Sequence, residues 1–511
     1  MVHPFRHFQN HTTVVEFQTT FLNKTIEKCA LFIYNVTRYI IVEYIYNKRR
    51  VFNLANLEEL EKYKKIHMIG IGGVSMSGIA EILKNWGFSV TGSDASQSEY
   101  TDDLISHGIP VKIGHDMENV AYADLVVYTA AVKEDNPELV ESKNLNIKTM
   151  ERSEFLGELT LLSNETISIC GTHGKTTTTS MISLSFINGG KDPYVQVGAD
   201  LKQLNGNYRI GKYPYFIIES CEYVDSFLQF HPETVALLNI EEDHLDYFKD
   251  INAIKASFKK FVEKVPERGF VVYNADDPNC AEVVKDLKCN KISYSIKNPD
   301  ADWIATNIVL NDSGFYSFTA TNGYESIDIN LNVVGYHNIS NSLATIAVSK
   351  AHNIDNAIIK SSLEEFTGAS RRFEYRGLLN GARVFDDYAH HPTEIKATIN
   401  SAKEIPHERI WVVFQPHTYS RTKALWNEFA STFVDADTTL LLDIYAAREK
   451  DDGETTSQNL ADAINEVSNN CLYMSSFESC IDYLKENVKP GDVVLTIGAG
   501  SVTKISHEII K

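Results

Sequence analysis

The stretch TISICGTHGKTTTTS, residues 166–180, decides the fold of this chain, because it is typical of a buried strand, a glycine turn and a helix that begins at Lys175. Backbone N–H groups at the N-terminus of a helix lack intrahelical partners, and the helix dipole favours an anion there. The Lys175 ammonium adds a point charge, and the Thr176 hydroxyl suits a magnesium ion. The pattern therefore predicts a cradle for nucleotide phosphates.

The glycine spacing identifies this cradle as a compact variant of the phosphate loop. The long consensus has a glycine five residues before Gly174, where this chain has Ile169. A short glycine–lysine–threonine string also occurs in ordinary turns, which is the alternative interpretation. The choice between the two depends on the rest of the chain.

Length, composition and charge limit the classes of protein to consider. A chain of 511 residues is too long for one hydrophobic core and suggests roughly three domains. Its 43% hydrophobic content and mean hydropathy of −0.21 are typical of a soluble globular protein. A net charge of −20 argues against a nucleic-acid partner, which requires a basic face. Seven cysteines without a CxxC pair indicate reduced thiols in a cytoplasmic protein, rather than a zinc site or a disulfide framework.

The first fifty residues differ from the rest in charge, since they carry seven Lys or Arg against three Asp or Glu. Their most apolar part, residues 30–46, is interrupted by Arg38 and Glu43 and falls short of the ~20 apolar residues that span a bilayer. No small-residue cleavage site follows it. We therefore expect residues 1–52 to be an extension without a fold of its own, dispensable for activity; an amphipathic surface helix is the alternative.

A second glycine turn lies near the start of the remaining chain. Residues 64–69 are typical of a strand, and GIGGVSMSG at residues 70–78 then leads into a helix. Gly70 and Gly72 would permit a tight turn and the close approach of a diphosphate, with the helix N-terminus behind them. Ser75 stands where a third glycine is expected, which disfavours a dehydrogenase.

The next predicted strands complete a small parallel sheet around this turn. The strand at residues 88–92 ends at Ser93 and Asp94, about where an acidic residue meets a ribose in such units. Asp94 could instead cap a turn, and both interpretations stay open. A further strand at residues 124–129 would add a strand end able to hold a nucleotide.

Two strands after the phosphate loop end in residues that can bind a metal ion. The apolar run at residues 215–218 stops at Glu219, and the strand at residues 234–239 leads into an acidic segment that contains His244. Magnesium takes hard oxygen ligands while phosphates supply the others. A lone histidine would more often be a surface residue, but the two strand ends together predict a magnesium site.

The last part of the chain repeats strand–helix units, which predicts another doubly wound domain. Its strands are expected at residues 383–387, 409–415, 438–443 and 492–497. Before it, the polar string GYHNISN at residues 335–341 precedes a predicted helix at residues 342–352, and could contact a base or cap that helix. Arg371 and Arg372 could clamp a phosphate or face solvent.

Several strings in this order resemble the Mur ligase family. They are GIGGVSMSGIAE at 70–81, GTHGKTTTT at 171–179, RRFE at 371–374, DDYAHHPTE at 386–394 and FQPHTYSRT at 414–422. The likeness runs from about residue 53 to the C-terminus. It implies an α/β fold of three domains: a Rossmann-like UDP-sugar domain at 53–162, a central P-loop-type ATPase domain at 163–366, and a Rossmann-like C-terminal ligase domain at 367–511.

The resemblance is closest to the family member that joins L-alanine to UDP-N-acetylmuramate. It implies that the muramyl carboxylate attacks the γ-phosphate of ATP and that the alanine amine then opens the acyl phosphate, with Mg²⁺ as cofactor. Activating a carboxylate in this way requires a phosphate loop, a metal site and an acceptor domain, which agrees with the motifs. No nucleic acid and no stable membrane insertion are expected.

The resemblance also assigns site residues by matching position. The ATP-binding residues are Gly171, Thr172, His173, Gly174, Lys175, Thr176, Thr177, His337, Asn338, Asn341, Arg372 and Asp387. The UDP-sugar residues are Gly70, Gly72, Gly73, Ser93 and Asp94, and the metal ligands are Thr176, Glu219 and His244. The catalytic residues are Lys175, His244, His390 and Arg421, and Tyr388, His390 and Arg421 form the amino-acid end. Thr418 stands where many relatives have arginine, so recognition of the alanine carboxylate rests on Arg421.

Four other functions compete with this prediction. A sister ligase adds a murein tripeptide to the same sugar, but the string at residues 415–421 favours a free amino acid. A folate-type polyglutamate ligase shares the central domain and needs no turn at residues 70–78. A nucleotide-dependent oxidoreductase follows from that turn alone, and a non-catalytic nucleotide switch leaves residues 386–421 unexplained.

Overall fold

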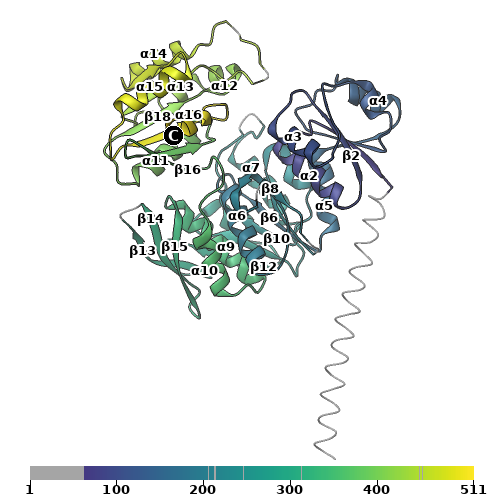
Figure 1. Ribbon diagram of the computed structural model, residues 1–511. Helices are drawn as coiled ribbons and strands as arrows, with labels where there is room; N and C mark the ends of the chain where they lie inside the picture. The colour runs from purple at the N-terminus through teal and green to yellow at the C-terminus, as the bar shows by residue number, and fades with distance from the viewer. Residues whose placement is uncertain are drawn as a thin grey trace, which may run out of the picture. The chain divides into compact units, whose positions relative to one another are not determined.

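The computed structural model describes residues 62–510 except 205, 212–213, 245–246, 312–313, 448 and 452. The predicted extension at residues 1–52 lies outside the described residues. Three separate β-sheets, each flanked by helices, follow one another along the described chain (Figure 1). The protein is thus of the α/β class, with three sheet-containing domains as expected.

The first sheet is fully parallel, with the strand order β3-β2-β1-β4-β5. Its strands are β1 (Lys65–Ile69), β2 (Ser89–Asp94), β3 (Val111–Ile113), β4 (Leu125–Tyr128) and β5 (Lys148–Glu151). The helices around it are α2 (Val74–Asn85), α3 (Glu99–Ser106), η1 (Met117–Val120), α4 (Pro137–Asn144) and α5 (Arg152–Leu162). Four of the five residues of β1 are buried, because a central parallel strand is covered on both faces.

The second sheet has ten strands in the order β15-β14-β13-β12-β11-β10-β6-β9-β7-β8. Its strands are β6 (Glu165–Cys170), β7 (Tyr194–Leu201), β8 (Gly206–Arg209), β9 (Tyr215–Glu219), β10 (Thr234–Leu237), β11 (Phe270–Asn274), β12 (Asn290–Ser295), β13 (Trp303–Leu310), β14 (Phe315–Thr321) and β15 (Ser326–Val334). Its helices are α6 (Lys175–Asn188), η2 (Lys202–Leu204), η3 (Tyr223–Gln229), α7 (Ile251–Val262), α8 (Pro278–Val284), α9 (His337–Ala351) and α10 (Asn356–Glu365). Helix α6 begins at Lys175, as the central motif predicts.

Helices α6 and α9 form the centre of the core over this sheet. Helix α6 is rich in Ser and Thr but buried on most sides, so its hydroxyls need internal partners. Ser180 and Ser183 donate to the carbonyls one turn back, at 2.8 and 2.7 Å. Ser185 shares a 2.8 Å hydrogen bond with Ser349 of α9. These three serines are therefore satisfied where α6 packs against α9, whereas the buried hydroxyls of Thr178 and Thr179 have no partner among the described residues.

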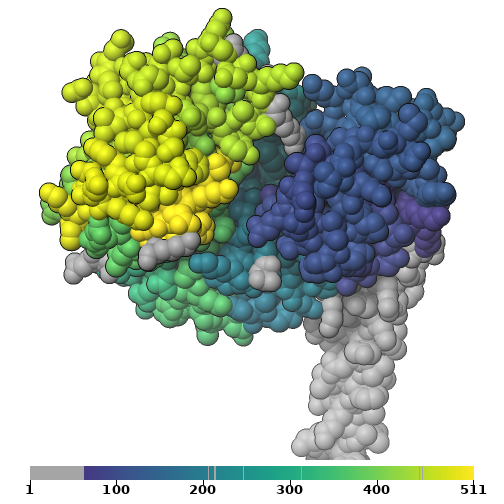
Figure 2. Space-filling view, turned by 45° about the horizontal axis from the view of Figure 1, so that its top comes forward, coloured from purple at the N-terminus to yellow at the C-terminus, as the bar shows by residue number. Residues whose placement is uncertain are grey.

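The third sheet has the order β16-β17-β21-β18-β19-β20, and only β16 of its strands is antiparallel to its neighbour. Its strands are β16 (Glu374–Leu379), β17 (Ala382–Asp387), β18 (Ile410–Phe414), β19 (Thr438–Leu441), β20 (Cys471–Tyr473) and β21 (Val493–Ile497). Its helices are α11 (Pro392–Lys403), α12 (Tyr419–Ala424), α13 (Trp426–Ala430), α14 (Ser457–Val467), α15 (Phe477–Asn487) and α16 (Thr503–Ile509). The later of these elements are drawn in yellow-green to yellow and lie together on one side of the view in Figure 2.

Two features differ from the sequence expectations. The helix predicted from residue 342 begins five residues earlier, at His337. The chain turns at Gly335, with φ +101°, directly after β15 ends at Val334. The antiparallel ribbon β13–β15 was not predicted. Its last strand alternates exposed and buried residues, a pattern of period two that a search for parallel, fully buried strands does not detect.

The remaining expectations on class concern thiols and membranes. The six cysteines within the described part of the chain form no disulfide with one another. Of the helices formed by the described residues, none combines the length and apolar character that spanning a membrane requires.

Helix α5 depends on a glycine where it meets the loop that follows β9. A Cβ atom at Gly157 would lie 2.4 Å from the carbonyl oxygen of Gln229. Gly157→Ala should therefore lower the free energy of unfolding by about 1–3 kcal/mol, although alanine is intrinsically favoured in a helix by about 1 kcal/mol. Urea unfolding would measure the change. Glu158→Ala, at the neighbouring exposed position, is the control, and an equal effect of both substitutions would contradict the steric argument.

Candidate active site

The loop between β6 and α6 is built so that the N-terminus of α6 stays open. Gly171 and Gly174 adopt φ +142° and +82°, which side chains disfavour. A Cβ atom at Gly174 would also lie 2.8 Å from Oδ1 of Asn341. Asn239 holds the loop from the other side, because its Oδ1 accepts from the N–H of His173 at 2.7 Å and its Nδ2 donates to the carbonyl of His173 at 3.1 Å. The two glycines and Asn239 thus fix the conformation of the loop that leads into α6.

Lys175 is the first residue of α6, and its side chain turns back toward this loop. Its Nζ donates to the carbonyls of Gly171 and Thr172, at 2.6 and 3.0 Å, and lies 3.1 Å from Oε2 of Glu222. Burial works against the charge of Lys175, but Glu222 and its neighbours outweigh burial and raise the pKa of Lys175 above its usual value. Lys175 is therefore a protonated cation at neutral pH.

Three adjacent parallel strands bring the predicted metal ligands to one edge of the sheet. Strand β6 pairs with β9 on one side and with β10 on the other, so their carboxyl ends lie side by side. The Thr176 hydroxyl donates to Oε1 of Glu219 at 3.0 Å, and Oε2 of Glu219 accepts from the N–H of Gly198 at 2.7 Å. The structure thus brings Thr176 and Glu219 into direct contact, as the sequence suggests.

His244 belongs to a second group of possible ligands. Ligand atoms of Glu222, Asp243 and His244 all lie within 4.8 Å of one another. The His244 backbone has φ +51°, and its ring lies 4.6 Å from that of Tyr223. The two carboxylates supply the hard oxygen atoms that magnesium prefers. Glu222 and Asp243 stand in the two strand-end segments that the sequence marked as able to bind a metal ion, but they were not among the assigned ligands Thr176, Glu219 and His244.

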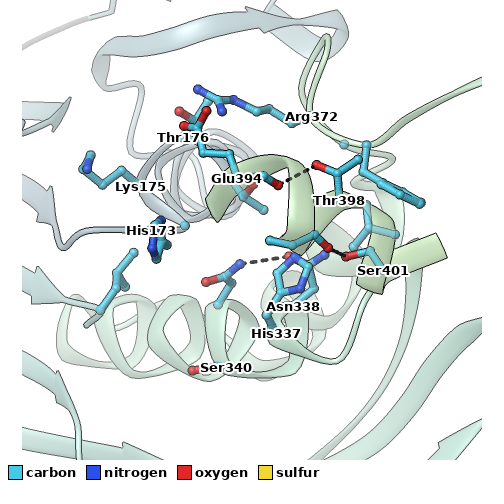
Figure 3. Close-up of a pocket in the computed structure, with 18 of the residues that line it drawn as sticks. His173, Lys175, Thr176, His337, Asn338, Ser340, Arg372, Glu394, Thr398 and Ser401 are labelled. Carbon is cyan, nitrogen blue, oxygen red and sulfur yellow. Dashed lines mark hydrogen bonds between the residues drawn. The ribbon is translucent and has the colours of Figure 1, made fainter. Parts of the chain in front are cut away.

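A cavity of about 1600 Å³ connects the phosphate loop with α9 and with residues of the third sheet's domain. All predicted ATP-binding residues line it except Gly171, and Glu219, His244 and His390 line it too. Figure 3 shows Lys175 and Thr176 at the start of α6, His337 and Asn338 at the start of α9, and Arg372 from the third part of the chain around this space.

Asn338 and Asn341 are held by each other at the start of α9. Nδ2 of Asn341 donates to Oδ1 of Asn338 at 2.9 Å, and Nδ2 of Asn338 donates to the carbonyl of Val334 at 2.7 Å. Both side chains are buried. The two asparagine side chains line the cavity and are held in place by these hydrogen bonds.

The two arginines of the RRFE string have different environments. Arg371 is paired with the buried Asp386, at 3.1 Å from Nε to Oδ2, and its guanidinium lies 4.9 Å from the Tyr388 ring centre. Arg372 lines the cavity, and no carboxylate within the described part of the chain forms an ion pair with it. The sequence left open whether these arginines clamp a phosphate or face solvent. Arg371 does neither, because it is paired with Asp386. Arg372 faces the cavity, where a phosphate could reach it.

Asp387 is fixed by backbone donors at the end of β17. Its carboxylate accepts from the N–H groups of Phe373 and Ala389, both at 2.8 Å. Burial raises the pKa of Asp387 to about 6, and the nearby positive charge of Arg372 opposes the rise. The side chain is thus oriented toward the cavity together with Arg372.

His417 lies between two residues of the predicted amino-acid end, Arg421 and His390. No role was assigned to His417 from the sequence. A guanidinium can only donate, so Nδ1 of His417 accepts from Nη1 of Arg421 across 3.1 Å. The ring of His417 lies 6.0 Å from that of His390, which lines the cavity. Thr418 adopts φ +68° and its hydroxyl caps α12 by accepting from the N–H of Arg421. Arg421 and Tyr388 are not among the described residues that line the cavity.

The predicted UDP-sugar residues lie together at the edge of the first sheet, but mostly bind one another. The N–H groups of Gly70 and Ile71 both donate to the carbonyl of Ser93, at 2.8 and 3.0 Å. Oδ2 of Asp94 accepts from the N–H of Gly72 at 3.0 Å, so Asp94 acts as a turn cap, one of its two open interpretations. The Ser93 hydroxyl donates to the buried Glu138 at 2.6 Å. The N–H groups of the glycine turn are therefore already bonded.

Comparison with known proteins gives consistent matches along the chain. The model "Mur ligase family, catalytic domain" matches residues 65–163, "Mur ligase middle domain" matches 169–349, and "Mur ligase, glutamate ligase domain" matches 371–500. A UDP-N-acetylmuramate--L-alanine ligase of Acetivibrio thermocellus is 50% identical over 451 residues, which are 88% of this chain and 96% of the relative. The enzyme of the same name from Clostridium perfringens is 47% identical, over 88% of this chain and 98% of its own length.

Solved structures give the same picture. The UDP-N-acetylmuramate-alanine ligase MurC of Thermotoga maritima aligns with a TM-score of 0.74 and 28% identity, over 87% of this chain and 98% of that one. A murein peptide ligase of Psychrobacter arcticus aligns with a TM-score of 0.64 and 26% identity, over 87% and 98%.

The contact between Arg421 and His417 makes a prediction about protonation. Burial first, and the positive charge of Arg421 next, lower the pKa of His417 to about 4. Arg421→Gln should raise the pKa of His417, because it removes that charge, whereas Lys423→Gln on the same helix should leave it near 4. NMR titration of the His417 ring would measure both variants. A pKa that does not move in Arg421→Gln would contradict the contact.

The same pKa predicts how stability depends on pH. A base whose pKa is lower in the folded state stabilises the protein above its unfolded pKa of about 6.5, and this contribution is lost as the pH falls toward 4. Between these two values, the free energy of unfolding should therefore fall less steeply in His417→Asn than in the parent chain. Parallel curves, measured by urea unfolding, would contradict the prediction.

Proposed function

Because the chain belongs to the Mur ligase family, we propose that it joins L-alanine to UDP-N-acetylmuramate at the expense of ATP, in peptidoglycan precursor synthesis. The products are UDP-N-acetylmuramoyl-L-alanine, ADP and phosphate. The observation that carries this proposal is the cavity that the phosphate loop shares with Arg372, Asp387 and His390. The relatives named for this reaction, 46–50% identical over most of the chain, support the choice of substrates.

The reaction has two steps. A carboxylate oxygen of the muramyl group attacks the γ-phosphorus of ATP, which forms an acyl phosphate and releases ADP. The neutral amine of alanine then attacks the acyl carbon, the C–N bond forms, and phosphate leaves as the amine loses a proton. Lys175 and the N-terminus of α6 neutralise the charge on the β- and γ-phosphates while the anionic partners meet.

Magnesium fits two groups of side chains at this edge of the sheet. Thr176 and Glu219 would hold one ion beside the phosphate loop, and His244 with Glu222 and Asp243 would hold a second. A bound Mg²⁺ neutralises phosphate charge. The protein's own part is to keep these oxygen and nitrogen atoms at the ends of β9 and β10.

The domain of the third sheet supplies the remaining contacts to the nucleotide and to the amino acid. Arg372 and Asp387 reach the nucleotide, and Tyr388, His390 and Arg421 form the amino-acid end. His417 orients Arg421 through its ring nitrogen. Domain boundaries near 53–162, 163–366 and 367–511, and a cytoplasmic site of action, belong to the same proposal.

The second candidate is the ligase that adds a murein tripeptide to the same sugar. The likeness to the murein peptide ligase of Psychrobacter arcticus supports it, but with a lower TM-score than the alanine ligase. An oxidoreductase is excluded by membership of a ligase family. ADP release with UDP-N-acetylmuramate and each amine in turn, namely L-alanine, glycine, L-serine and the tripeptide, separates the candidates. Release that depends on the tripeptide and not on L-alanine would overturn the proposal.

Lys175→Ala should lower turnover by roughly two to three orders of magnitude with the fold intact. Removing a preorganised charge from the transition state costs about 3–4 kcal/mol, and no other lysine or arginine of the described chain contacts the loop carbonyls. Steady-state ADP release measures the effect, and circular dichroism monitors the fold. Turnover within tenfold of the parent enzyme would reject the role of Lys175.

Arg421→Lys should raise the Michaelis constant for alanine far more than those for ATP or UDP-N-acetylmuramate. A planar guanidinium binds a carboxylate through two parallel hydrogen bonds, which lysine cannot form. Lys423→Arg, two residues away and exposed, is the matched control. Equal changes in all three constants would assign Arg421 to domain closure instead.

A further inference from the structure

Ser75, the residue in place of the third glycine of the first turn, has partners that explain its hydroxyl. Its Oγ accepts from Nη1 of Arg152 at 3.3 Å and from Nε2 of Gln196 at 2.6 Å. Arg152 is the first residue of α5, whereas Gln196 lies in β7 of the second sheet. The start of α2 is therefore held by a side chain from another domain.

The neighbouring contacts extend this connection between α2 and the β7–β8 pair. Nε2 of Gln196 also donates to the carbonyl of Ser75 at 2.9 Å, and Nδ2 of Asn207 in β8 donates to the carbonyl of Val74. A Cβ atom at Gly78 would lie 3.0 Å from Cβ of Tyr208, so the glycine permits the close approach of β8. The first two turns of α2 thus pack directly on the second sheet's edge.

Several hydrogen-bond donors of this cluster have no acceptor among the described residues. The glycine turn uses its own N–H groups, and the first intrahelical bond runs from the N–H of Ser77 to the carbonyl of Gly73. The N–H groups of Val74, Ser75 and Met76 precede that bond and have no intrahelical acceptor. The Ser75 oxygen accepts two hydrogen bonds, and its own proton finds no acceptor among the described residues.

Two further side chains of the cluster are incompletely bonded. Across the described chain, no carboxylate forms an ion pair with Arg152, although the protein has a net charge of −20. Gln196 is 4% exposed, and its Oε1 has no hydrogen-bond partner in the described residues. The guanidinium of Arg152 and the hydroxyl proton of Ser75 suit an anionic group. The Oε1 atom of Gln196 suits a neighbouring hydroxyl or N–H donor of the same ligand.

We propose that Gln196 is a positioning residue for the nucleoside diphosphate of the acceptor, although it belongs to the ATP-binding part of the chain. Ser75 and Arg152 bind the diphosphate oxygens at the start of α2, and Gln196 fixes the Ser75 side chain between them. Acceptor binding therefore requires the first two domains to be docked through α2 and β7. The inference rests on the proposed function, because the acceptor there is a UDP-sugar.

Binding of UDP and of uridine, measured by calorimetry on the full chain, tests the proposal. Gln196→Met keeps the size of the side chain and removes its hydrogen bonds, and Ser75→Ala and Arg152→Ala remove the groups that it positions. Each should weaken UDP binding by about tenfold or more while uridine binding stays within about twofold, since only the diphosphate contacts are lost. The Michaelis constant for UDP-N-acetylmuramate should rise likewise and that for ATP should not.

Two controls separate positioning from general loosening. Gln203→Met changes the same residue type between β7 and β8 at a side chain that contacts Glu365, and Ser77→Ala removes a hydroxyl that bonds within α2. Both should bind UDP like the parent chain. The double variant Ser75→Ala, Gln196→Met should bind UDP about as well as Ser75→Ala alone, because Gln196 acts through Ser75.

The outcomes separate this inference from the proposed function. Gln196→Met binding UDP like the parent chain, or losing UDP, uridine and ATP alike, would overturn the inference. Should Gln196→Met fail to fold, unchanged UDP binding in Ser75→Ala and Arg152→Ala would overturn it equally. Absence of alanine-dependent ADP release in the parent chain would instead reject the proposed function.

Discussion

Parallel pairing of β6 with both β9 and β10 is the constraint on which the rest of the site depends. It places Ile169 level with Glu219 and Cys170 level with Leu237, so three strand ends meet at one edge. The phosphate loop, the predicted metal ligands and Asn239, which holds His173, are then neighbours in space. The direct bond from Thr176 to Glu219 follows from this register.

Electrostatics must reconcile a net charge of −20 with anionic substrates. The groups that contact each cation of the site show how this is achieved. Lys175 is paired with Glu222, but Arg421 contacts a neutral imidazole and Arg152 a hydroxyl. A neutral partner fixes the direction of a guanidinium without cancelling its charge. Local placement therefore overcomes the repulsion that the whole chain exerts on an anion.

Much of this fold follows from the sequence, because buried parallel strands and glycine turns leave strong local patterns. The helix start at Lys175 and the main strands of the last sheet could be predicted in this way. The antiparallel ribbon β13–β15 could not, since its last strand alternates exposed and buried residues and lacks the continuous apolar run of a buried parallel strand. The role of Asp94 and the separate environments of Arg371 and Arg372 depend on which donors and acceptors are already satisfied. Which donors and acceptors are satisfied can be read only from coordinates. The same holds for Gln196, whose side chain contacts Ser75, 121 residues away in the sequence.

The serine contact between α6 and α9 has a consequence for the nucleotide. The start of α6, which is proposed to bind the phosphates, and the start of α9, where the sequence suggested a contact with the base, belong to one packed pair of helices. The two helices are joined by Ser185 and Ser349 and by the fit of Gly174 against Asn341. The spacing between these two helix ends is therefore set by the packing of α6 against α9 within one part of the chain. A nucleotide that spans both ends must match a distance that side-chain packing has already fixed.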